Sequence, residues 1–422
     1  MNSRYDIIVA GGGISGAIAA VAASREGAKV LLIERDGSLG GAATNGLVYP
    51  FARYLAKDNN GNIITVNKGL FLEAINRLQE IDQYNSDDYV SYHDAAFNQE
   101  ALKYVLDRLT IENGVEVLFH TFISNVSAEE GKVKSVTVVN KSGVAEIFAD
   151  YFIDCTGDAD VAAKAGCSYR IGDGNGNCQP MTMCFRIGNV NQALFDKHKN
   201  EIYKLFNEMQ ENGTLNCPGL FITFNHIGDG ILHFNSTRVI NHSGIDAVEL
   251  SRAEQEGRAQ VIETYKFLKK YAKGFENCVL LSAASSIGVR ETRLIDGDYV
   301  LTSDDVLKCR HFEDSIACGS YLIDIHNPKG KGVELKELDG VYYHIPYRCI
   351  TPKGFDNIFV AGRCISATHE AQGACRTIPI CASVGEAAGV AASLCVKSGV
   401  TSRELKIETL QHKIEEFGGK YN

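Results

Sequence analysis

Short apolar runs separated by glycine-rich segments organise the amino-terminal part of the chain. Ile7, Ile8 and Val9 are branched apolar residues bounded by glycine, which predicts a short buried strand. Alanine and other small apolar residues recur over 14–26 and predict a helix, and the apolar run 30–33 predicts a second strand. The opening segment is therefore expected to form a strand, a tight turn, a helix and a strand.

The glycines between the first strand and the helix follow a spacing with a physical role. Gly11, Gly13 and Gly16 fit G-x-G-x-x-G, in which the glycines permit a tight turn, close approach of a pyrophosphate and close helix–strand packing. Glu34 ends the second strand, where an acidic residue binds a ribose hydroxyl. Glu34 would repel a 2′-phosphate, so the pattern predicts a site for NAD or FAD rather than NADP.

Similar patterns occur further along the chain. Asn98 is placed to cap a helix that has apolar residues on one face, and 114–119 is expected to form the next strand. Residues 132–140 alternate between polar and apolar, with a turn predicted at 141–143. The segment 151–166 repeats the order of strand, glycine and helix, so a second approach of the backbone to a ligand is expected there.

The pattern of hydrophobic and polar residues is different in the middle of the chain. Polar loops, short β-rich runs and one long charged helix over 247–272 suggest an inserted domain. A strand pattern returns over 357–364, followed by a helix of small residues over 378–397 that permits close packing. We therefore predict an α/β fold: a discontinuous Rossmann-like dinucleotide-binding domain with a central parallel sheet, formed by 1–166 and 342–422, and an inserted α+β substrate or cap domain, 167–341.

Composition narrows the classes of partner. The 422 residues are 45% hydrophobic, and the formal net charge of −10 argues against a nucleic-acid partner. No apolar run approaches the ~20 residues that span a bilayer, so no membrane partner is expected. The thirteen cysteines include no C-x-x-C pair, which favours reduced thiols in a cytoplasmic protein and predicts no metal site.

Several longer motifs resemble one known family. "GGGISG", "CTGDADVAAKAG", "GVRETRLIDGDYVLTSDDV" and "IPYRCITPKGFDNIFVAGRCISATHEAQGACR" are similar, in order, to FAD-dependent oxidoreductases with a glutathione-reductase-type, or two-dinucleotide-type, FAD-binding domain. The similarity runs from the first strand to about Ser393. It implies FAD as the cofactor and implies no particular substrate.

The resemblance also implies where the cofactor lies. Arg363 departs from the family pattern, because many related flavoproteins have an aspartate at this strand end, and it leaves the ribitol role of Asp158 open. The residues implied to contact FAD are Gly11, Gly13 and Gly16 at the pyrophosphate, Glu34 at the ribose, Arg35, 117–121, Thr156 and Gly157 near the adenine, Gly41, Ala42 and Thr44 at the ribitol and flavin ring, Gly362 and Arg363 at the ribitol, and 372–378, with Thr377 and Ile378, at the pyrimidine edge.

Two histidines are candidates for acid/base chemistry. His369 follows in the segment expected to border the flavin ring, although a hydrogen bond to loop backbone would equally explain it. Asp324 and His326 alternate along a predicted strand and would point to one face, either as an oriented catalytic pair or as a satisfied core pair. Arg376 would offset negative charge on the reduced ring or form a structural ion pair.

Two further groups have two interpretations each. The charged trio Arg290, Glu291 and Arg293 would bind an anionic or hydroxylated substrate, or form a buried salt-bridge cluster between domains. The aromatic group Tyr343, His344 and Tyr347 would form a wall of the substrate cleft, or ordinary interdomain packing.

The absent motifs define the functional expectation. There is neither a redox dithiol nor a second glycine fingerprint for NADPH, so a one-cofactor flavoenzyme is expected. The leading hypothesis is an FAD-dependent oxidoreductase that transfers a hydride between flavin N5 and a small organic substrate, with an unidentified electron donor or acceptor. The alternative is an electron-transfer subunit that delivers electrons to a partner protein, although no iron–sulfur motif supports it. The helix expected over 405–417 would serve surface packing or a homo-oligomer contact.

Overall fold

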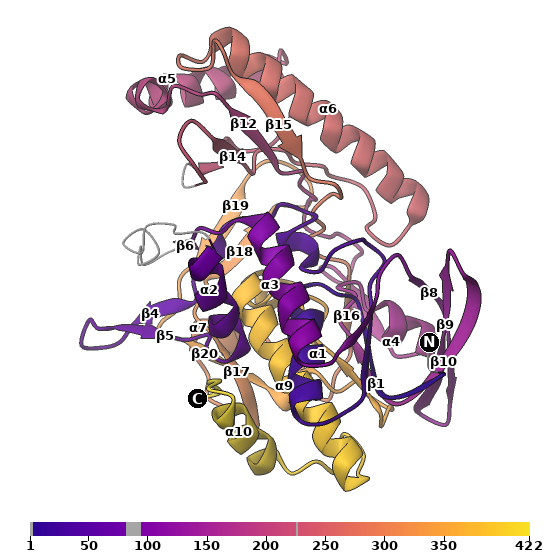
Figure 1. Cartoon of the computed structure of the whole chain (residues 1–422). Helices are drawn as coiled ribbons and strands as arrows, with labels where there is room; N and C mark the ends of the chain where they lie inside the picture. The colour runs from indigo at the N-terminus through magenta and orange to yellow at the C-terminus, as the bar shows by residue number, and fades with distance from the viewer. Residues whose placement is uncertain (1–2, 82–93, 225–226) are drawn as a thin grey trace.

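The computed structural model describes residues 3–81, 94–224 and 227–422. A main body contains a twisted sheet with helices beside it, and a smaller cap lies above the body in Figure 1. The chain enters the cap and returns, so both termini lie in the body. This arrangement places the loops of the body directly under the cap.

Five parallel strands form the centre of the main sheet. Strand β1 (Arg4–Ala10) lies between β2 (Val30–Ile33) and β10 (Gly143–Asp154), β2 pairs with β7 (Glu116–Leu118), and β10 pairs with β21 (Ile358–Val360). All five run in one direction, so their carboxyl ends meet at one edge, where open α/β sheets bind ligands. The predicted parallel α/β fold is confirmed.

Strand β10 belongs to two kinds of pairing. Its first half pairs antiparallel with β9 (Lys132–Asn140), which pairs with β8 (Phe122–Glu129), and its second half joins the parallel strands. The sequence predicted a hairpin and a later strand as separate elements, but they are one strand of 12 residues. Turn residues mark the start of β10, and nothing in the local sequence marks the change of partner.

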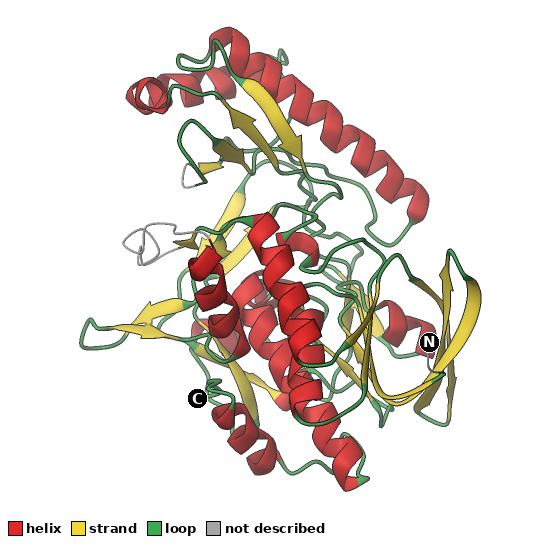
Figure 2. Ribbon diagram, viewed as in Figure 1, coloured by secondary structure: helices red, strands yellow, loops and turns green. Residues whose placement is uncertain are grey.

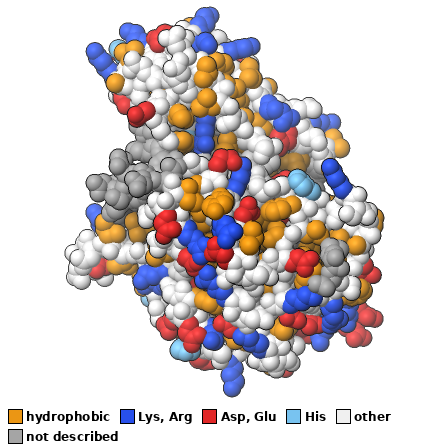
Figure 3. Space-filling model, in the orientation of Figure 1, with side chains coloured by type: hydrophobic (Ala, Val, Ile, Leu, Met, Phe, Trp, Pro, Cys, Tyr) orange, Lys and Arg blue, Asp and Glu red, His pale blue; other side chains and the backbone are white. Residues whose placement is uncertain are grey.

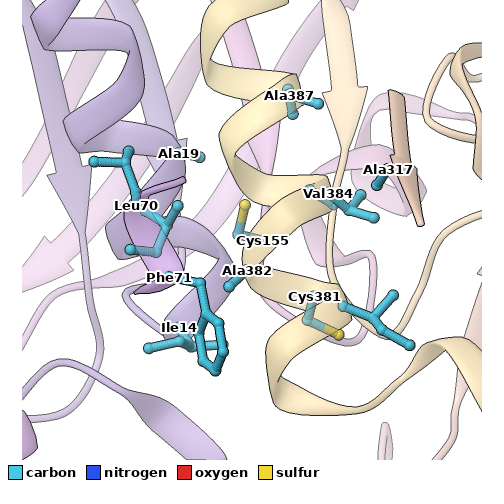
Figure 4. Close-up of a cluster of buried hydrophobic side chains, with 14 of the residues drawn as sticks. Ile14, Ala19, Leu70, Phe71, Cys155, Ala317, Cys381, Ala382, Val384 and Ala387 are labelled. Atoms are coloured by element: carbon cyan, nitrogen blue, oxygen red, sulfur yellow. The ribbon is translucent and has the colours of Figure 1, made fainter. Parts of the chain in front are cut away.

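Two helices cross beside the sheet with almost no space between them. In α9 (Ile378–Ser398), Gly385 and Gly389 face α1 (Ile14–Arg25) so closely that a Cβ at either glycine would lie 2.2 Å from a backbone oxygen of α1. Figure 4 shows the buried apolar side chains around this crossing. The expectation that small residues allow close packing is confirmed.

Helix α9 corrects one expectation from the sequence. It is long and apolar enough to cross a membrane, contrary to the prediction that no segment would be. Of its most apolar window, 94% is buried inside the protein, so the core accounts for its composition.

The remaining elements of the body are short. Asn98 caps α3 (Gln99–Glu112) as predicted, by accepting hydrogen bonds from the amides of Glu100 and Ala101. The other helices are α2 (Leu70–Ile81), α4 (Asp160–Ala165), α7 (Ser303–Leu307), α8 (His369–Cys375) and α10 (Ile407–Glu416). The paired short strands are β3 (Phe51–Ala52) with β6 (Asp94–Ala95), β4 (Leu55–Lys57) with β5 (Ile63–Thr65), β11 (Tyr169–Ile171) with β16 (Arg293–Ile295), β17 (Ser315–Gly319) with β20 (Tyr343–Pro346), and β18 (Ile323–His326) with β19 (Val333–Lys336).

The cap has its own sheet and its own core. Its antiparallel strands follow the order β13 (Thr223–Phe224), β14 (Leu232–Phe234), β12 (Phe185–Gly188) and β15 (Val279–Ala283). Helices α5 (Gln192–Glu211) and α6 (Ala247–Tyr271) cover this sheet, and Figure 2 shows them as the outermost layer. Helix α6 agrees with the predicted charged helix to within one residue.

The clusters of buried side chains indicate which segments pack with the cap and which pack with the body. The apolar core of the cap runs from Met181 to Ile287, whereas Leu301, Ile316 and Ile325 belong to the core cluster that contains α1 and α9. The boundaries predicted at 166/167 and 341/342 stay a prediction. The cores indicate that much of the chain beyond residue 290 packs with the body.

The cysteines and the groups that could hold a metal bear on the expected chemistry. All thirteen cysteines are unpaired thiols, and all but Cys178 and Cys309 are buried. Within the described residues, no group of three or more His, Cys, Asp or Glu side chains is arranged to hold a metal ion.

The helix crossing yields the first prediction. Gly389→Ala should lower the free energy of unfolding of the apoprotein by about 3 kcal/mol or more, because backbone must move to admit the methyl group. Denaturant unfolding measures this loss. Gly13→Ala is the control, since a Cβ at Gly13 meets no atom within 4 Å. Equal stability of the two variants would contradict the account of the crossing.

A buried acid on α9 yields the second prediction. Glu386 accepts a hydrogen bond from the amide of Leu70 at 2.6 Å, and burial raises its pKa to about 8. Its contribution to stability is therefore fully present below its usual pKa of 4.5 and is lost as pH rises through 8.

Glu386→Gln should remove this loss of stability at high pH, because glutamine does not ionise. The stability of the variant relative to wild type should improve by about 3 to 5 kcal/mol between pH 4.5 and pH 8.5. Unfolding of the apoprotein across this range measures the difference, with Glu408→Gln on the exposed side of α10 as the control. A difference that does not vary with pH would show that Glu386 ionises normally.

Candidate functional site

A long cleft opens at the carboxyl edge of the parallel strands. The space within it and at its open mouth amounts to about 1430 Å³, and it lies under the cap. The body contributes the turn after β1, the ends of β2 and β10, the loop 40–46 and the start of α9, while the cap side contributes 286–289 and part of α6. The glycines that follow β1, β10 and β21, which are Gly11, Gly157 and Gly362, therefore all line this cleft.

The first glycine turn is fixed by contacts that exclude larger residues. Gly11 has φ +91°, and a Cβ there would lie 2.6 Å from the backbone oxygen of Cys155. A Cβ at Gly16 would lie 1.8 Å from the backbone oxygen of Gly11. Gly13 instead faces open space in the cleft, so the amino end of α1 is accessible to an anion. Gly11 and Gly16 thus allow the tight turn and the close packing that the fingerprint predicts, while the pyrophosphate contact at Gly13 stays a prediction.

Glu34 lies at the predicted strand end and is itself held in place. Its carboxylate accepts hydrogen bonds from the amide of Gly12 at 2.5 Å and of Asp36 at 2.8 Å. Burial raises the pKa of Glu34, and the two amides act in the opposite direction. Arg35 lines the cleft beside it. This end of the cleft therefore presents an oriented acid beside a basic side chain.

The remaining cofactor candidates divide into two groups. Thr44 does not line the cleft, because its hydroxyl donates to the backbone oxygen of Leu39 at 2.7 Å and so holds the loop 40–46. Thr377 precedes α9, and its buried hydroxyl has no hydrogen-bond partner. The candidates that do line the cleft are Gly41, Ala42, Thr156, Gly157, Gly362, Arg363 and Ile378.

Arg363 and Asp158 form one buried pair in the wall of the cleft. Their guanidinium and carboxylate groups lie 2.7 Å apart, and Asp158 also accepts a hydrogen bond from the hydroxyl of Thr292. Burial disfavours the charge of Arg363, but the adjacent Asp158 outweighs it and raises the pKa of Arg363. Arg363, which stands where many related flavoproteins have an aspartate, is thus paired with Asp158, the acid that follows Gly157.

His369 lies outside the cleft. Its Nδ1 is 2.8 Å from Glu291, whose other oxygen accepts a hydrogen bond from the amide of Gln179. Burial would lower the pKa of His369, but the hydrogen bond and charge of Glu291 raise it above 6.5. Among the described residues, those that line the cleft do not include His369. The position of His369 does not support the expectation that it borders the flavin ring. Its ion pair with Glu291 instead joins α8 to the segment before β16.

A second, smaller cavity lies beside the cleft. It is small, with room for about one water-sized molecule, and His326 and Arg290 are among its walls. Arg290 directly follows Gly288 and Val289, which line the main cleft, so one short segment borders both spaces. The full lining is Thr182, Leu220, Ile222, Asn235, Thr237, Arg238, Arg290 and His326.

Asp324, His326 and Arg376 come together between the two spaces. The Nε2 atom of His326 lies 3.5 Å from Asp324, and Arg376 lies 3.8 Å from the same carboxylate. Arg376 also lines the main cleft. The amide of His326 and the guanidinium of Arg376 both reach the side-chain oxygen of Gln179, at 3.2 and 3.5 Å. The predicted Asp324–His326 pair therefore exists and has Arg376 as a neighbour.

Charge states in this group follow from burial and from the arginines. Burial and the positive charge of Arg290 lower the pKa of His326 to about 4, so its imidazole is neutral near pH 7. Burial alone would raise the pKa of Asp324, but His326, Arg376 and Arg290 hold it well below its usual range. The group thus combines a carboxylate, a neutral imidazole and guanidinium groups.

Other predicted residues have structural roles. Arg293 forms an ion pair with Asp160 at 2.9 Å. Tyr343, His344 and Tyr347 are buried in the body, and the hydroxyl of Tyr347 donates to the backbone oxygen of Ser402 at 2.7 Å. For these residues the structure supports packing rather than a cleft wall.

Several residues of the second cavity were not predicted as site residues. Thr182, Asn235 and Arg238 come from three separate segments of the cap region, and the sequence analysis assigned none of them a role. The folding of the cap over β18 brings them next to His326.

The main cleft has the features that a bound FAD requires. The hydroxyl of Ser15, in the first turn of α1, is buried in the cleft, where the thiol of Cys155 is its neighbour. Together with the open cradle at Gly13, it is placed to meet phosphate oxygens. Glu34 provides the acid expected beside a ribose hydroxyl.

The comparison with solved structures found matches of low sequence identity over most of this chain. A geranylgeranyl bacteriochlorophyll reductase-like protein from Thermoplasma acidophilum is 13% identical, with a TM-score of 0.49 over 98% of this chain and 84% of that one. The p-nitrophenol 4-monooxygenase PnpA from Pseudomonas putida is 11% identical, with a TM-score of 0.49 over 98% and 85%. The myxobacterial chondrochloren halogenase CndH, described as FAD-dependent, is 14% identical, with a TM-score of 0.42 over 99% and 78%.

The comparison with curated proteins gave no match. The family model described as FAD dependent oxidoreductase matches residues 6–414, which is nearly the whole chain. This match agrees with the glycine turn, the cleft and the acid at the end of β2. The protein therefore belongs to the FAD dependent oxidoreductase family and is an enzyme with FAD as its cofactor.

Proposed function

We propose that the enzyme oxidises or reduces a small organic molecule held in the main cleft beside Arg376, next to the second cavity, with a hydride passing between that molecule and the flavin. The observation that carries this proposal is the position of the second cavity, because Arg290 lines it while the preceding residues Gly288 and Val289 line the FAD cleft. The polar side chains of this small cavity would lie next to a substrate in the part of the cleft that Arg376 lines.

The main cleft would hold FAD with the residues already described. Gly13 and Ser15 would meet the pyrophosphate, Glu34 the adenosine ribose, and Arg363 with Ile378 the ribitol and ring portions. When bound, FAD supplies two-electron chemistry at N5 of its ring. The protein must then hold the substrate, exclude water and move the accompanying proton.

His326 is the residue we assign to proton movement. Its imidazole is neutral near pH 7, lines the second cavity and has Asp324 beside it to orient the ring. A neutral imidazole next to a carboxylate accepts a proton and is then stabilised as an imidazolium. His369 is less suited to this role, because Glu291 occupies its Nδ1 and it lines neither space.

The second cavity favours a small-molecule enzyme over an electron-transfer subunit. An electron-transfer partner needs only an exposed edge of the flavin, whereas this cavity presents buried polar groups from the cap and from β18. Buried polar groups without full partners are costly, so they are retained where a ligand completes them. Arg238 and Arg376 each have a buried Nε atom without a partner.

The proposal as a whole is tested on the purified holoprotein. Its visible spectrum should show a flavin that bleaches under anaerobic conditions with at least one member of a panel of alcohols, amines and hydroxy acids, or that is reoxidised by an unsaturated or oxo compound after chemical reduction. A flavin that exchanges electrons only with a protein partner would contradict it.

Gly13→Ala tests the cofactor site. The apoprotein should keep its stability, because the added methyl group meets no protein atom, while FAD affinity should fall about 10-fold or more as the methyl group keeps the pyrophosphate from the backbone. Fluorescence titration of the apoprotein with FAD measures the change. Gly330→Ala, in a loop outside the cleft where the nearest atom to an added Cβ lies at 4.0 Å, is the control. Undiminished FAD binding by Gly13→Ala would place the pyrophosphate elsewhere.

His326→Ala tests the proton carrier. With an active substrate, the variant should retain FAD and slow flavin reduction by about 10² to 10⁴. The wild-type rate should also fall as pH drops through about 4, where His326 becomes protonated. Stopped-flow absorbance under anaerobic conditions measures both effects.

His369→Ala is the matched control for this comparison. It removes a buried ion pair with Glu291 and should lower stability, but the rate in the folded fraction should stay within a few-fold of wild type. Should His369→Ala be the slow variant and His326→Ala react normally, the assignment of the proton carrier would pass to His369.

A further inference from the structure

We propose that Gln179 is a positioning residue, whose side-chain amide ties the point where the chain enters the cap to Arg376 in the FAD cleft. The proposal rests on the proposed function, because it concerns the placement of Arg376 beside the flavin. It is carried by a buried chain of hydrogen bonds that begins at the cap and ends at the wall of the cleft.

Gln179 lies at the joint between the cap and the body. The apolar core of the cap spans 181–287, so Gln179 stands where the chain enters the cap and Glu291 where it leaves. The backbone amide of Gln179 donates to the carboxylate of Glu291 at 3.0 Å. Two backbone hydrogen bonds between Thr182 and Gly288, at 3.0 and 2.7 Å, join the same two crossings. The two segments that carry the cap are therefore bound to each other at Gln179.

Backbone groups fix the direction in which the side-chain amide of Gln179 points. Its oxygen accepts a hydrogen bond from the backbone amide of His326 at 3.2 Å, and its nitrogen donates to the side-chain oxygen of Gln372 at 3.1 Å. The side-chain nitrogen of Gln372 donates in turn to the backbone oxygen of Arg290 at 2.8 Å. A backbone N–H only donates and a backbone oxygen only accepts, so reversing either amide would place like groups against each other. The oxygen of Gln179 therefore faces β18 and Arg376.

Both glutamines are shielded from water. Gln179 is 2% exposed, and Gln372 is fully buried. A buried polar group that loses its partner is destabilising, and a fully satisfied buried network holds one arrangement. The two amides therefore form a rigid connection between the crossings of the cap and the polar groups of the cleft.

Arg376 is held by contacts that are all long. Its guanidinium lies 3.5 Å from the side-chain oxygen of Gln179, 3.5 Å from the backbone oxygen of Asp324 and 3.8 Å from the carboxylate of Asp324. Arg363, in the same cleft, lies only 2.7 Å from Asp158. Contacts of 3.5 Å are at the outer limit of a hydrogen bond, so the loss of one of them leaves the guanidinium free to move.

The position of Arg376 matters because its side chain lines the cleft. A guanidinium beside the ring favours negative charge on the reduced flavin, and this attraction falls as the two groups separate. Acidic and basic side chains are interspersed over the face seen in Figure 3, so the charges of the exterior largely offset one another there. The nearest buried charges therefore have the greatest effect. Through Gln179, the seating of the cap sets how readily the flavin accepts electrons.

The test measures the midpoint reduction potential of the flavin in the FAD-loaded protein, by anaerobic titration against a reference dye. Gln179→Met keeps the length of the side chain and removes both of its hydrogen-bonding groups. Its potential should be more negative than that of wild type by about a 10-fold change in the equilibrium, which is about 30 mV for a two-electron couple. Arg376→Gln, which removes the charge itself, should shift the potential in the same direction by at least as much.

A double variant and a matched control separate positioning from general damage. If Gln179 acts through Arg376, Gln179→Met should cause no further shift once Arg376→Gln is present. Gln210, in α5, donates to the backbone oxygens of Cys217 and Gly219 at 2.5 and 2.8 Å and does not line the cleft. Gln210→Met therefore removes comparable hydrogen bonds within the cap, and it should leave the potential unchanged.

Gln179→Asn answers the question if Gln179→Met fails to fold. Asparagine keeps an amide but is one methylene shorter, so it cannot reach Arg376 and Gln372 together from the same backbone position. It should shift the potential in the same direction as Gln179→Met.

Three outcomes would overturn the proposal and leave the proposed function standing. The first is an unchanged potential in the Gln179 variants when Arg376→Gln shifts it. The second is a set of shifts that add in the double variant, because Gln179 would then act independently of Arg376. The third is an equal shift in Gln210→Met. Failure of the proposed function gives a different result: if Arg376→Gln itself leaves the potential unchanged, the flavin ring does not lie beside Arg376 and both proposals are wrong.

Discussion

The close approach of α1 to the strands on which it rests is the constraint from which the rest of the structure follows. Gly16 lies against the backbone of Gly11, which in turn lies against Cys155 at the end of β10. These backbone contacts fix the amino end of α1 at the carboxyl edge of the sheet. The cleft, its cradle at Gly13 and the buried hydroxyl of Ser15 exist because no side chain separates these elements.

Helix α9 extends the same principle to the other side of α1. Gly385 and Gly389 bring two backbones together and carry the start of α9, with Ile378, into the cleft. Gly13 and Ile378, which are 365 residues apart in sequence, thus meet at one ligand site. An enzyme assembled in this way depends on helix packing for its geometry, so substitutions far from the cofactor will alter its site.

The sequence predicted the parts of this structure that depend on local pattern. The turn at Gly11, the acid at Glu34 and the cap at Asn98 each follow from spacing within one segment, and all three were found in place. Contacts between distant segments were not predictable in the same way. His369 is next to a cofactor segment in sequence, yet Glu291, from before β16, holds it outside the cleft.

The second cavity shows the same limit most clearly. Asp324 and His326 were identifiable from their alternation on one strand, but Thr182, Asn235 and Arg238 reach them only through the cap. Thr44 is a smaller example. A threonine hydroxyl can contact a ligand, but the hydroxyl of Thr44 donates a hydrogen bond to the backbone oxygen of Leu39. Side-chain direction and long-range pairing decide such cases, and neither is encoded in local spacing.

The central claim is that the FAD cleft and the second cavity form one active site. A crystal structure of the FAD-loaded protein tests it most directly. The account predicts that the flavin ring lies beside Arg376 and that one face of the ring opens toward the cavity of His326 and Arg290. A ring that points away from Arg376, or that is separated from this cavity by packed protein, would contradict the account.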